Sequence, residues 1–569
     1  MDRGQPLKRF ALLVMLVLLR PAAEGREPVY AQKAMVVAAE DHAVDIGVDV
    51  LRSGGNAVDA AVAVGFALAV THPFAGNIGG GGFMLIRFAD GRTTFVDFRE
   101  KAPSRASRDM YLDSSGKPTE DSMVGWRSVG VPGTVRGLAL AHQRYGHKPW
   151  AELVNPAINL ARNGFPVSHA QMESWKYYSS LLSRFPESKH IFLRDGTYYK
   201  WQELFKQPEL ARTLDRIARF GAADFYDGET AHLLAAEMAK NGGLITLGDL
   251  HEYQAIERAP LEGDYKDFHI ITSPPPSASG VGLLQMLATL NGTDYEKNGA
   301  GSAKAYHYLA EVMRRFYADR SQYLGDPDSV NNPVSRLLDP AYVNARRATI
   351  DPQRATPSEK VNPGLSAGIE GTDTTHFSIV DAQGNAVAVT YTLNHAYGSG
   401  VSVPTAGFLL NNEMDDFAAS PGEPNTYDLV QGDKNAIAPG KRPLSSMVPT
   451  IILKDNKPFL VLGSPGGSTI ATAVLQVIIN VIDFHMNVQD AVDFPRIHHQ
   501  WRPDLLECES GVSPDTISLL QQMGYSVEQA HSKILPRVEA ILLSEGWLQG
   551  ANDDRSSNRS GGEGKAAGY

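Results

Sequence analysis

The stretch GTDTTHFSIVD, residues 371–381, places two adjacent threonines at the start of a predicted β-strand. Threonine is common in strands because its branched side chain fits a pleated surface. A threonine hydroxyl can also act as a nucleophile when the chain is cut in front of it and its own amino group activates it. Either both threonines are ordinary strand residues, or one of them, Thr374 or Thr375, is an N-terminal nucleophile.

Strand geometry separates the two threonines because successive side chains point to opposite faces. Thr374 falls on a polar face with His376 and Ser378, whereas Thr375 falls on the more apolar face. One face of the next predicted strand also gathers three polar residues: Thr390, Thr392 and Asn394. This pattern suits a site or a solvated face, although a solvated face more usually carries charge. At most one of the two threonines can serve a given site.

Two glycine-rich turns are candidate anion-binding elements. In GSPGGS, residues 463–468, Gly466 and Gly467 precede a predicted helix, where backbone N–H groups and the helix dipole could stabilise an oxyanion. A plain tight turn is the alternative. NIGGGGF, residues 77–83, lacks the spacing of a phosphate-binding loop, so we interpret it as a structural turn.

Three further segments carry complementary polar groups. FREKAP contains Arg99 just after a predicted strand, KRPLSSM contains the adjacent hydroxyls of Ser445 and Ser446, and NNEMDDF contains acids and amides. An arginine with hydroxyls suits a carboxylate, and carboxylates suit an ammonium group. Together they predict a site for the zwitterionic end of an amino acid.

Metal and thiol chemistry are disfavoured. The 16 histidines show no HExxH or related spacing, and IHHQW, residues 497–501, is interpreted as structural. The single cysteine, Cys508, excludes an intrachain disulfide or a CxxC site, and it has no cationic neighbour in the sequence to activate it. We therefore expect no metal ion and no cofactor.

The elements that position these residues follow from hydrophobic periodicity. The pattern predicts helices from about Ala34, a hairpin over residues 83–98, and helical segments to about Tyr323. The last third reads as four strands and then a long apolar helix that begins after Gly467. The sequence shows no internal repeat.

Two segments lose this periodicity. Residues 326–372 are rich in Pro, Gly, Ser and Asp, and we predict an exposed linker there that ends at Thr374. An irregular segment that stops at a threonine-led strand is what a processing site should look like. The tail after Gly550 is low in apolar residues and is predicted to be loose in part.

Composition and the N-terminus indicate an exported globular protein. The 569 residues are 43% hydrophobic and 21% charged, and the net charge of −11 argues against nucleic-acid or anionic-membrane binding. Basic residues precede the apolar run at residues 10–19, and small residues follow it, which is the order of a secretory signal. Ten apolar residues are too few for the roughly 20 of a membrane span, although an uncleaved anchor is the alternative.

The sequence resembles the γ-glutamyltransferases, also called glutathione hydrolases. The resemblance runs from about Ala34 to the final AAGY and rests on an ordered set of motifs: FREKAP, VPGTVRG, TTHFSIVD, AVAVTYTLN, LLNNEMDDF, KRPLSSM, GSPGGS and PRIHHQW. It implies an α+β fold of the N-terminal nucleophile hydrolase type, a four-layer αββα sandwich with two stacked, mainly antiparallel sheets. It also implies a signal peptide at 1–24, a large subunit at 25–373 and a small catalytic subunit at 374–569.

The resemblance assigns roles residue by residue. Thr374 becomes the nucleophile after self-cleavage, Thr392 supports its hydroxyl, and Gly466 and Gly467 form the oxyanion hole. The substrate-binding residues are divided between the α-carboxylate (Arg99, Ser445 and Ser446) and the α-amino group (Asn394, Glu413 and Asp416). Many bacterial relatives carry glutamine at position 413, and either side chain accepts from an ammonium group. Residues 419–433 resemble a lid loop with Tyr427 as its latch, and SPPPSASG departs from the more usual PPPSSGG at Ser279.

The implied reaction is cleavage of the γ-glutamyl amide of glutathione through a γ-glutamyl-Thr374 intermediate. Water, an amino acid or a dipeptide accepts the group, no cofactor takes part, and the location is the periplasm or medium of a bacterium. Two alternatives stay open, a cephalosporin (glutaryl) acylase on the same scaffold and an unprocessed binding protein without activity. Retention of Asp416 argues against the acylase, because a glutaryl group has no ammonium for it to pair with.

Overall fold

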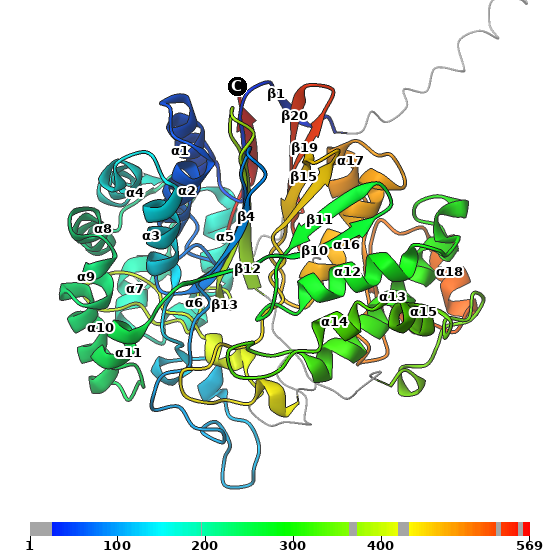
Figure 1. Cartoon of the computed structure of the whole chain (residues 1–569). Helices are drawn as coiled ribbons and strands as arrows, with labels where there is room; N and C mark the ends of the chain where they lie inside the picture. The colour runs from blue at the N-terminus through cyan, green and yellow to red at the C-terminus, as the bar shows by residue number, and fades with distance from the viewer. Residues whose placement is uncertain (1–25, 195, 363–372, 419–431, 531–535, 556–560) are drawn as a thin grey trace, which may run out of the picture.

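The computed structural model describes residues 26–194, 196–362, 373–418, 432–530, 536–555 and 561–569. Two seven-stranded sheets lie face to face between two groups of helices (Figure 1). All neighbouring strands in both sheets pair antiparallel. The predicted α+β sandwich of helix, sheet, sheet and helix is confirmed.

The sheet that contains the twin threonines, called here the β12 sheet, has the strand order β21 (Lys565–Gly568), β2 (Met35–Ala38), β12 (Asp373–Val380), β13 (Ala386–Asn394), β3 (Gly81–Arg87), β4 (Thr93–Asp97) and β9 (Ile256–Arg258). The opposing β15 sheet has the order β1 (Val29–Ala31), β20 (Trp547–Asn552), β19 (Glu539–Ser544), β15 (Lys457–Gly463), β14 (Thr450–Lys454), β11 (Phe268–Thr272) and β10 (Leu261–Tyr265).

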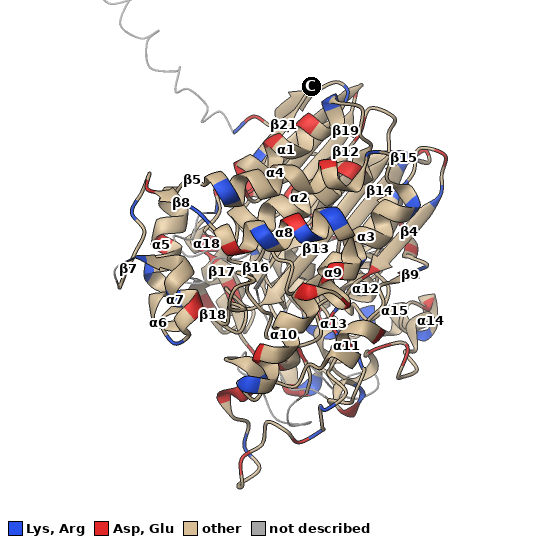
Figure 2. Ribbon diagram, turned by 90° about the vertical axis from the view of Figure 1, so that its left-hand side faces the viewer, with Lys and Arg blue, Asp and Glu red and all other residues tan. Residues whose placement is uncertain are grey.

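Helices cover the outer face of each sheet. The helices that cover the β12 sheet include α1 (Asp41–Arg52), α2 (Ala57–Thr71), α3 (Thr134–Tyr145), α4 (Trp150–Asn163), α8 (Pro208–Phe220) and α10 (Glu229–Lys240). Those beside the β15 sheet are α12 (Ser279–Leu290), α13 (Ala303–Tyr323), α15 (Pro340–Arg347), α16 (Thr469–Ile482), α17 (Val488–Asp493) and α18 (Pro514–Gln522). Acidic and basic residues are interspersed along the exposed faces of the helices (Figure 2).

Shorter elements complete the helical layers and the edges. The short helices are α5 (His169–Tyr177), α6 (Ser179–Leu182), α7 (Pro186–Phe192), α9 (Ala222–Tyr226), α11 (Leu247–Glu252) and α14 (Val334–Leu337). Small sheets pair β5 (Phe165–Pro166) with β8 (Leu204–Phe205), β6 (Leu193–Arg194) with β7 (Thr197–Tyr198), and β17 (Leu506–Glu509) with both β16 (Ile497–His498) and β18 (Val527–Ala530). No helix of the described residues is long and apolar enough to cross a bilayer.

Side-chain alternation in the β12 sheet creates two hydrophobic cores. Val36 and Phe377 pack with α1 and α2, whereas Met35 and Val37 point to the space between the sheets. Strand β2 is therefore apolar on both faces, because each face is covered by another layer. The start of the first helix was misplaced for this reason: residues 35–38 form β2, and α1 begins at Asp41.

Of the other predicted secondary-structure elements, some are confirmed and some are not. The hairpin β3–β4, the strands β12 to β15 and the helix α16 are confirmed. The prediction of an irregular linker is wrong for its described part, residues 326–362, because this part contains α14 and α15 and buries Asp326 and Val361, although most of its other residues are exposed or half-buried. The tail supplies β21, which pairs with β2 at the edge of the β12 sheet.

The polar face of β12 lies between the two sheets and is fully enclosed. The His376 ring bonds through Nδ1 to Thr390 Oγ1 at 2.8 Å and through Nε2 to Ser378 Oγ at 3.0 Å. Burial lowers the pKa of His376 to about 3, so the ring is neutral. A Cβ atom at Gly463, on β15, would lie 2.3 Å from His376 Cε1. Glycine is therefore required where the two sheets meet at this ring.

Gly463→Ala should lower the free energy of unfolding by about 1–3 kcal/mol, because the added methyl group must displace the buried ring or separate the sheets. Urea denaturation measures the change. Gly248→Ala is the matched control, since its Cβ would have only Thr246 Oγ1 nearby, at 3.5 Å. Equal stability of the two variants would contradict the close packing at Gly463.

Candidate active site

A small cavity at one end of the sheets brings together residues from distant parts of the chain. It is lined by Arg99, Thr374, Thr392, Asn394, Glu413, Asp416, Ser445, Ser446, Met447, Gly467 and Ile470. Thr374 lies at the start of β12, and the loops of residues 400–418 and 432–449, mostly yellow in Figure 1, gather below the sheets. Of the predicted site residues, Gly466 is not part of this lining, and Tyr427 lies outside the described residues.

The two threonines occupy different environments. Thr374 lines the cavity and is 6% exposed, while the Thr375 side chain is buried elsewhere and its hydroxyl has no hydrogen-bond partner among the described residues. The β12–β13 register shifts between residues 373 and 375, so Thr374 sits at an irregular point of the ladder. Of the two hydroxyls, only that of Thr374 belongs to the cavity.

Strand β13 holds two further polar groups at the cavity wall. The backbone N–H of Asn394 donates to Thr392 Oγ1 at 2.8 Å, and Asn394 Nδ2 donates to the Asn412 carbonyl at 3.0 Å. Asn394 has a φ of 74°, a left-handed conformation that asparagine tolerates better than most residues. With its Nδ2 group occupied, the side chain offers an acceptor oxygen, which suits a ligand ammonium group.

The turn NIGGGGF is structural, as the sequence indicated. Asn77 Nδ2 donates to the Thr392 carbonyl at 2.8 Å, and Asn77 Oδ1 accepts from the backbone N–H of Gly80 at 2.9 Å. A Cβ atom at Gly80 would lie 2.0 Å from the Thr392 carbonyl oxygen. The turn thus needs glycine to approach β13, and it fixes the backbone that carries Thr392.

Arg99 is the electrostatic centre of the site. Its guanidinium pairs with both Glu413 and Asp416, from the short 3-10 helix at Glu413–Asp416, and all three side chains are almost fully buried. The same guanidinium donates to the carbonyls of Pro443 at 3.3 Å and Leu444 at 3.2 Å. The family resemblance assigned Arg99 to the α-carboxylate of a ligand and the two acids to its α-amino group, and in the structure the three side chains contact one another.

Glu100 is a buried acid that the sequence analysis missed. Its carboxylate lies 3.8 Å from Arg99 Nη1, and both of its oxygens lack a hydrogen-bond partner among the described residues. Burial raises the pKa of Glu100 to about 7, and burial with the neighbouring acids also raises the pKa of Glu413. The single guanidinium does not offset the desolvation of Glu100 and Glu413, so both hold a proton more tightly than exposed glutamates do. The position of Glu100 beside Arg99 in FREKAP was the available signal.

A second loop supports the serine pair. The Ser445 N–H donates to the Pro276 carbonyl at 2.7 Å, and the Ala278 N–H donates to the Ser445 carbonyl at 2.7 Å. Ser277 Oγ donates to the Met447 carbonyl at 2.7 Å, whereas the Ser279 hydroxyl has no partner among the described residues. Ser277, rather than Ser279, therefore supports the loop that carries Ser445 and Ser446.

The turn before α16 is tight. Gly466 and Gly467 have φ values of 119° and 55°, and a Cβ atom at Gly466 would lie 2.3 Å from Pro536 Cβ. Gly467 faces the cavity at the N-terminus of α16, where the helix dipole favours negative charge. The arrangement can stabilise an oxyanion beside Thr374.

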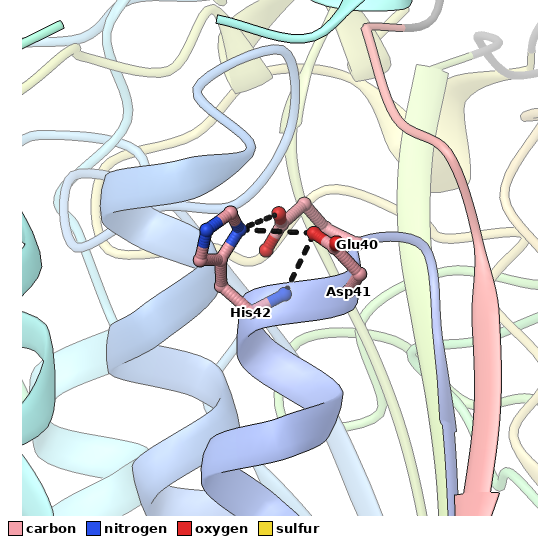
Figure 3. A group of neighbouring side chains, drawn as sticks. All are labelled: Glu40, Asp41 and His42. Atoms are coloured by element: carbon pink, nitrogen blue, oxygen red, sulfur yellow. Dashed lines mark hydrogen bonds and ion pairs between the residues drawn. The ribbon is translucent and has the colours of Figure 1, made fainter. Parts of the chain in front are cut away.

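Other groups do not join this site. At the start of α1, the Glu40 carboxylate accepts from the Ala43 N–H at 3.1 Å and contacts His42 Nδ1 at 2.7 Å, with Asp41 beside them, an arrangement that caps the helix (Figure 3). The His498 ring forms a hydrogen bond with Thr472, so it has a structural partner. Burial raises the pKa of the Cys508 thiol to about 12, which disfavours the reactive thiolate. A wider cavity of about 800 Å³ opens at the opposite end of the strands, near the turn after Val380.

Solved structures define the class of protein. A cephalosporin acylase from Bacillus halodurans superposes with a TM-score of 0.85 at 27% identity, covering 96% of this chain and 98% of that one. A γ-glutamyltranspeptidase chain from Helicobacter pylori is 44% identical with a TM-score of 0.57, covering 57% of this chain and 94% of that one. The protein is an enzyme with the fold of the N-terminal nucleophile hydrolases.

Sequence comparisons narrow the class to a family. The family model described as gamma-glutamyltranspeptidase matches residues 43–562. The glutathione hydrolase proenzyme of Escherichia coli strain K12 is 50% identical over 532 residues, covering 93% of this chain and 91% of that protein. The chain therefore belongs to the γ-glutamyltranspeptidase family. The proenzyme name and the shorter H. pylori chain support a precursor that gives two subunits.

Arg99→Gln should destabilise the fold by about 3–5 kcal/mol near pH 8, because it leaves Glu413 and Asp416 buried without their cation. The loss should shrink at lower pH as Glu413, whose pKa is raised by burial, takes up a proton. Urea denaturation at several pH values measures both effects. Arg92→Gln, which breaks the exposed pair with Asp90, should leave stability almost unchanged. A pH-independent or negligible loss for Arg99→Gln would contradict the account of this cluster.

Proposed function

We propose that the protein is a self-processing γ-glutamyltransferase and glutathione hydrolase whose nucleophile is Thr374. The observation that carries this proposal is the composition of one buried cavity, whose lining brings Thr374 together with Arg99, the serine pair, two carboxylates and an amide. Such a lining complements an amino acid whose side chain ends in an amide beside the threonine hydroxyl.

The first proposed step is cleavage of the precursor between Asp373 and Thr374. Cleavage gives a large subunit of residues 25–373 and a small subunit of residues 374–569, after removal of a signal peptide at 1–24 and export to a bacterial periplasm. The new α-amino group of Thr374, with an ordinary pKa near ~8, is matched to a general base at neutral pH. The proenzyme name of the Escherichia coli relative supports the processing of a precursor.

The second step is acyl transfer. The Thr374 hydroxyl attacks the γ-carbonyl carbon of glutathione or a related compound, and its proton passes to the α-amino group. The carbon–nitrogen bond then breaks, the leaving amine takes the proton, and a γ-glutamyl ester on Thr374 remains. Water or the amine of an amino acid or dipeptide attacks the ester and regenerates the free hydroxyl. No cofactor is required by this scheme.

The other residues of the site bind the substrate and stabilise the oxyanion. Thr392 supports the Thr374 hydroxyl, and Gly466 with Gly467 stabilises the oxyanion. The α-carboxylate is bound by Arg99, Ser445 and Ser446, and the α-ammonium by Asn394, Glu413 and Asp416. Binding then requires the zwitterion to insert into the existing ion pairs, so that each charge of the ligand replaces part of one pair. Tyr427 is proposed to latch a lid over the cavity.

Thr374→Ala should give a single uncut chain without γ-glutamyl anilide turnover, because both cleavage and acyl transfer lose their nucleophile. Denaturing gels, N-terminal sequencing and a turnover assay measure this. Thr375→Val is the matched control: it replaces a buried hydroxyl without a partner among the described residues, so it should cut normally and retain activity. Two bands from Thr374→Ala, or a small subunit that begins at another residue, would refute the assignment.

A glutaryl acylase is the second candidate, favoured by the structural likeness to the Bacillus halodurans acylase. Comparing γ-glutamyl and glutaryl anilides separates the two, because only the former carries the ammonium group that Asp416 and Glu413 would bind. We expect kcat/KM to be at least about 100-fold higher for the γ-glutamyl compound, the scale of a lost charged contact. Preference for the glutaryl compound would favour the acylase.

A further inference from the structure

A second arginine lies behind the wall of the cavity. Arg320, near the end of α13, is 2% exposed, and its Nη2 group donates to Ser446 Oγ at 3.3 Å. Ser446 itself lines the cavity, whereas Arg320 does not. The pair thus links a buried guanidinium to the surface that a ligand would contact.

The charges around Arg99 make this second guanidinium important. Arg99 already pairs with Glu413 and Asp416, and Glu100 lies 3.8 Å from it. Arg99 also donates to the backbone carbonyls of Pro443 and Leu444. One cation shared by several acids gives little net attraction for an added carboxylate. A positive charge on the serine side of the cavity would favour a ligand carboxylate there.

The hydrogen bond also fixes the role of the Ser446 hydroxyl. A guanidinium has no acceptor, so in this pair Ser446 is always the acceptor and Arg320 always the donor. The single proton of the hydroxyl is then directed to a different acceptor. A carboxylate in the cavity is suited to be that acceptor, and polarisation by the guanidinium would strengthen the bond.

Arg320 is held by a rigid element. One turn earlier on α13, Tyr317 donates its hydroxyl to the Ser468 carbonyl, next to the N-terminus of α16. The adjacent Asp319 accepts from Gln285 on α12 at 2.9 Å and from Arg346 on α15 at 2.8 Å. The end of α13 is therefore tied to three other helices, which limits movement of the guanidinium.

We propose that Arg320 is a positioning residue for the α-carboxylate of the γ-glutamyl group, acting through Ser446. The inference rests on the proposed function and adds to it a residue outside the cavity wall. It assigns the carboxylate a two-layer subsite, in which Ser446 makes the contact and Arg320 orients and polarises it. A residue of this kind changes substrate binding more than the chemical step.

Arg320→Gln tests the proposal in steady-state kinetics with a γ-glutamyl anilide. We expect KM to rise about tenfold while kcat changes less than about threefold, because a charge-assisted contact to the bound substrate is weakened. Arg336→Gln, an exposed arginine on α14, is the matched control and should change neither constant. Unchanged KM in a folded, cleaved Arg320→Gln enzyme would overturn the proposal.

A double-mutant cycle tests whether Arg320 acts through Ser446. In a Ser446→Ala background, Arg320→Gln should have no further effect on kcat/KM. If the two residues acted independently, the fold-changes of the two substitutions would multiply. Arg320→Lys retains a cation and provides a second variant if Arg320→Gln does not fold, with a smaller expected rise in KM. A purely structural role would lower the melting temperature and the cleaved fraction with KM unchanged, and that result would refute the proposal.

The same measurements separate this inference from the proposed function. An inactive wild-type enzyme would refute the proposed function. An active wild-type enzyme whose KM does not respond to substitution of Arg320 would refute only the inference about this residue.

Discussion

The burial of β12 on both faces is the constraint on which the rest of the structure depends. One face packs against helices and the other against the β15 sheet, so a shift of one residue would exchange an apolar face for a polar one. The hydrogen bonds of His376 satisfy the polar face where water is excluded, and Gly463 leaves room for its ring. This register fixes which of the twin threonines faces the cavity.

The cavity combines buried charges that no single element could hold. Arg99 follows β4, its acidic partners come from a 3-10 helix more than 300 residues later, and the serines lie in a third segment. Burial favours the protonated forms of Glu100 and Glu413, and the Arg99 guanidinium opposes that effect. A zwitterion adds no net charge to such a site, whereas a simple anion or cation does.

Local patterns predicted elements well where one signal dominated. The hairpin β3–β4 and the helix α16 have clear periodicity and turn residues, and the cap of α2 by Asn56 follows a capping box with Asp59. Prediction failed at β2, a short apolar run directly before the polar start of α1. It also failed at residues 326–362, whose irregular composition conceals contacts such as that of Thr356 with Glu311. Those contacts involve residues distant in sequence, so composition does not reveal them.

The sequence by itself determined the alternation that separates Thr374 from Thr375, and its ordered motifs indicated the family. Only the tertiary structure decided that Arg99 pairs with the two acids, that Glu100 lies beside them, and that Arg320 lies behind Ser446. The physical reason is that alternation follows from local backbone geometry, whereas the partners of a buried charge depend on which distant segments share its low-dielectric surroundings.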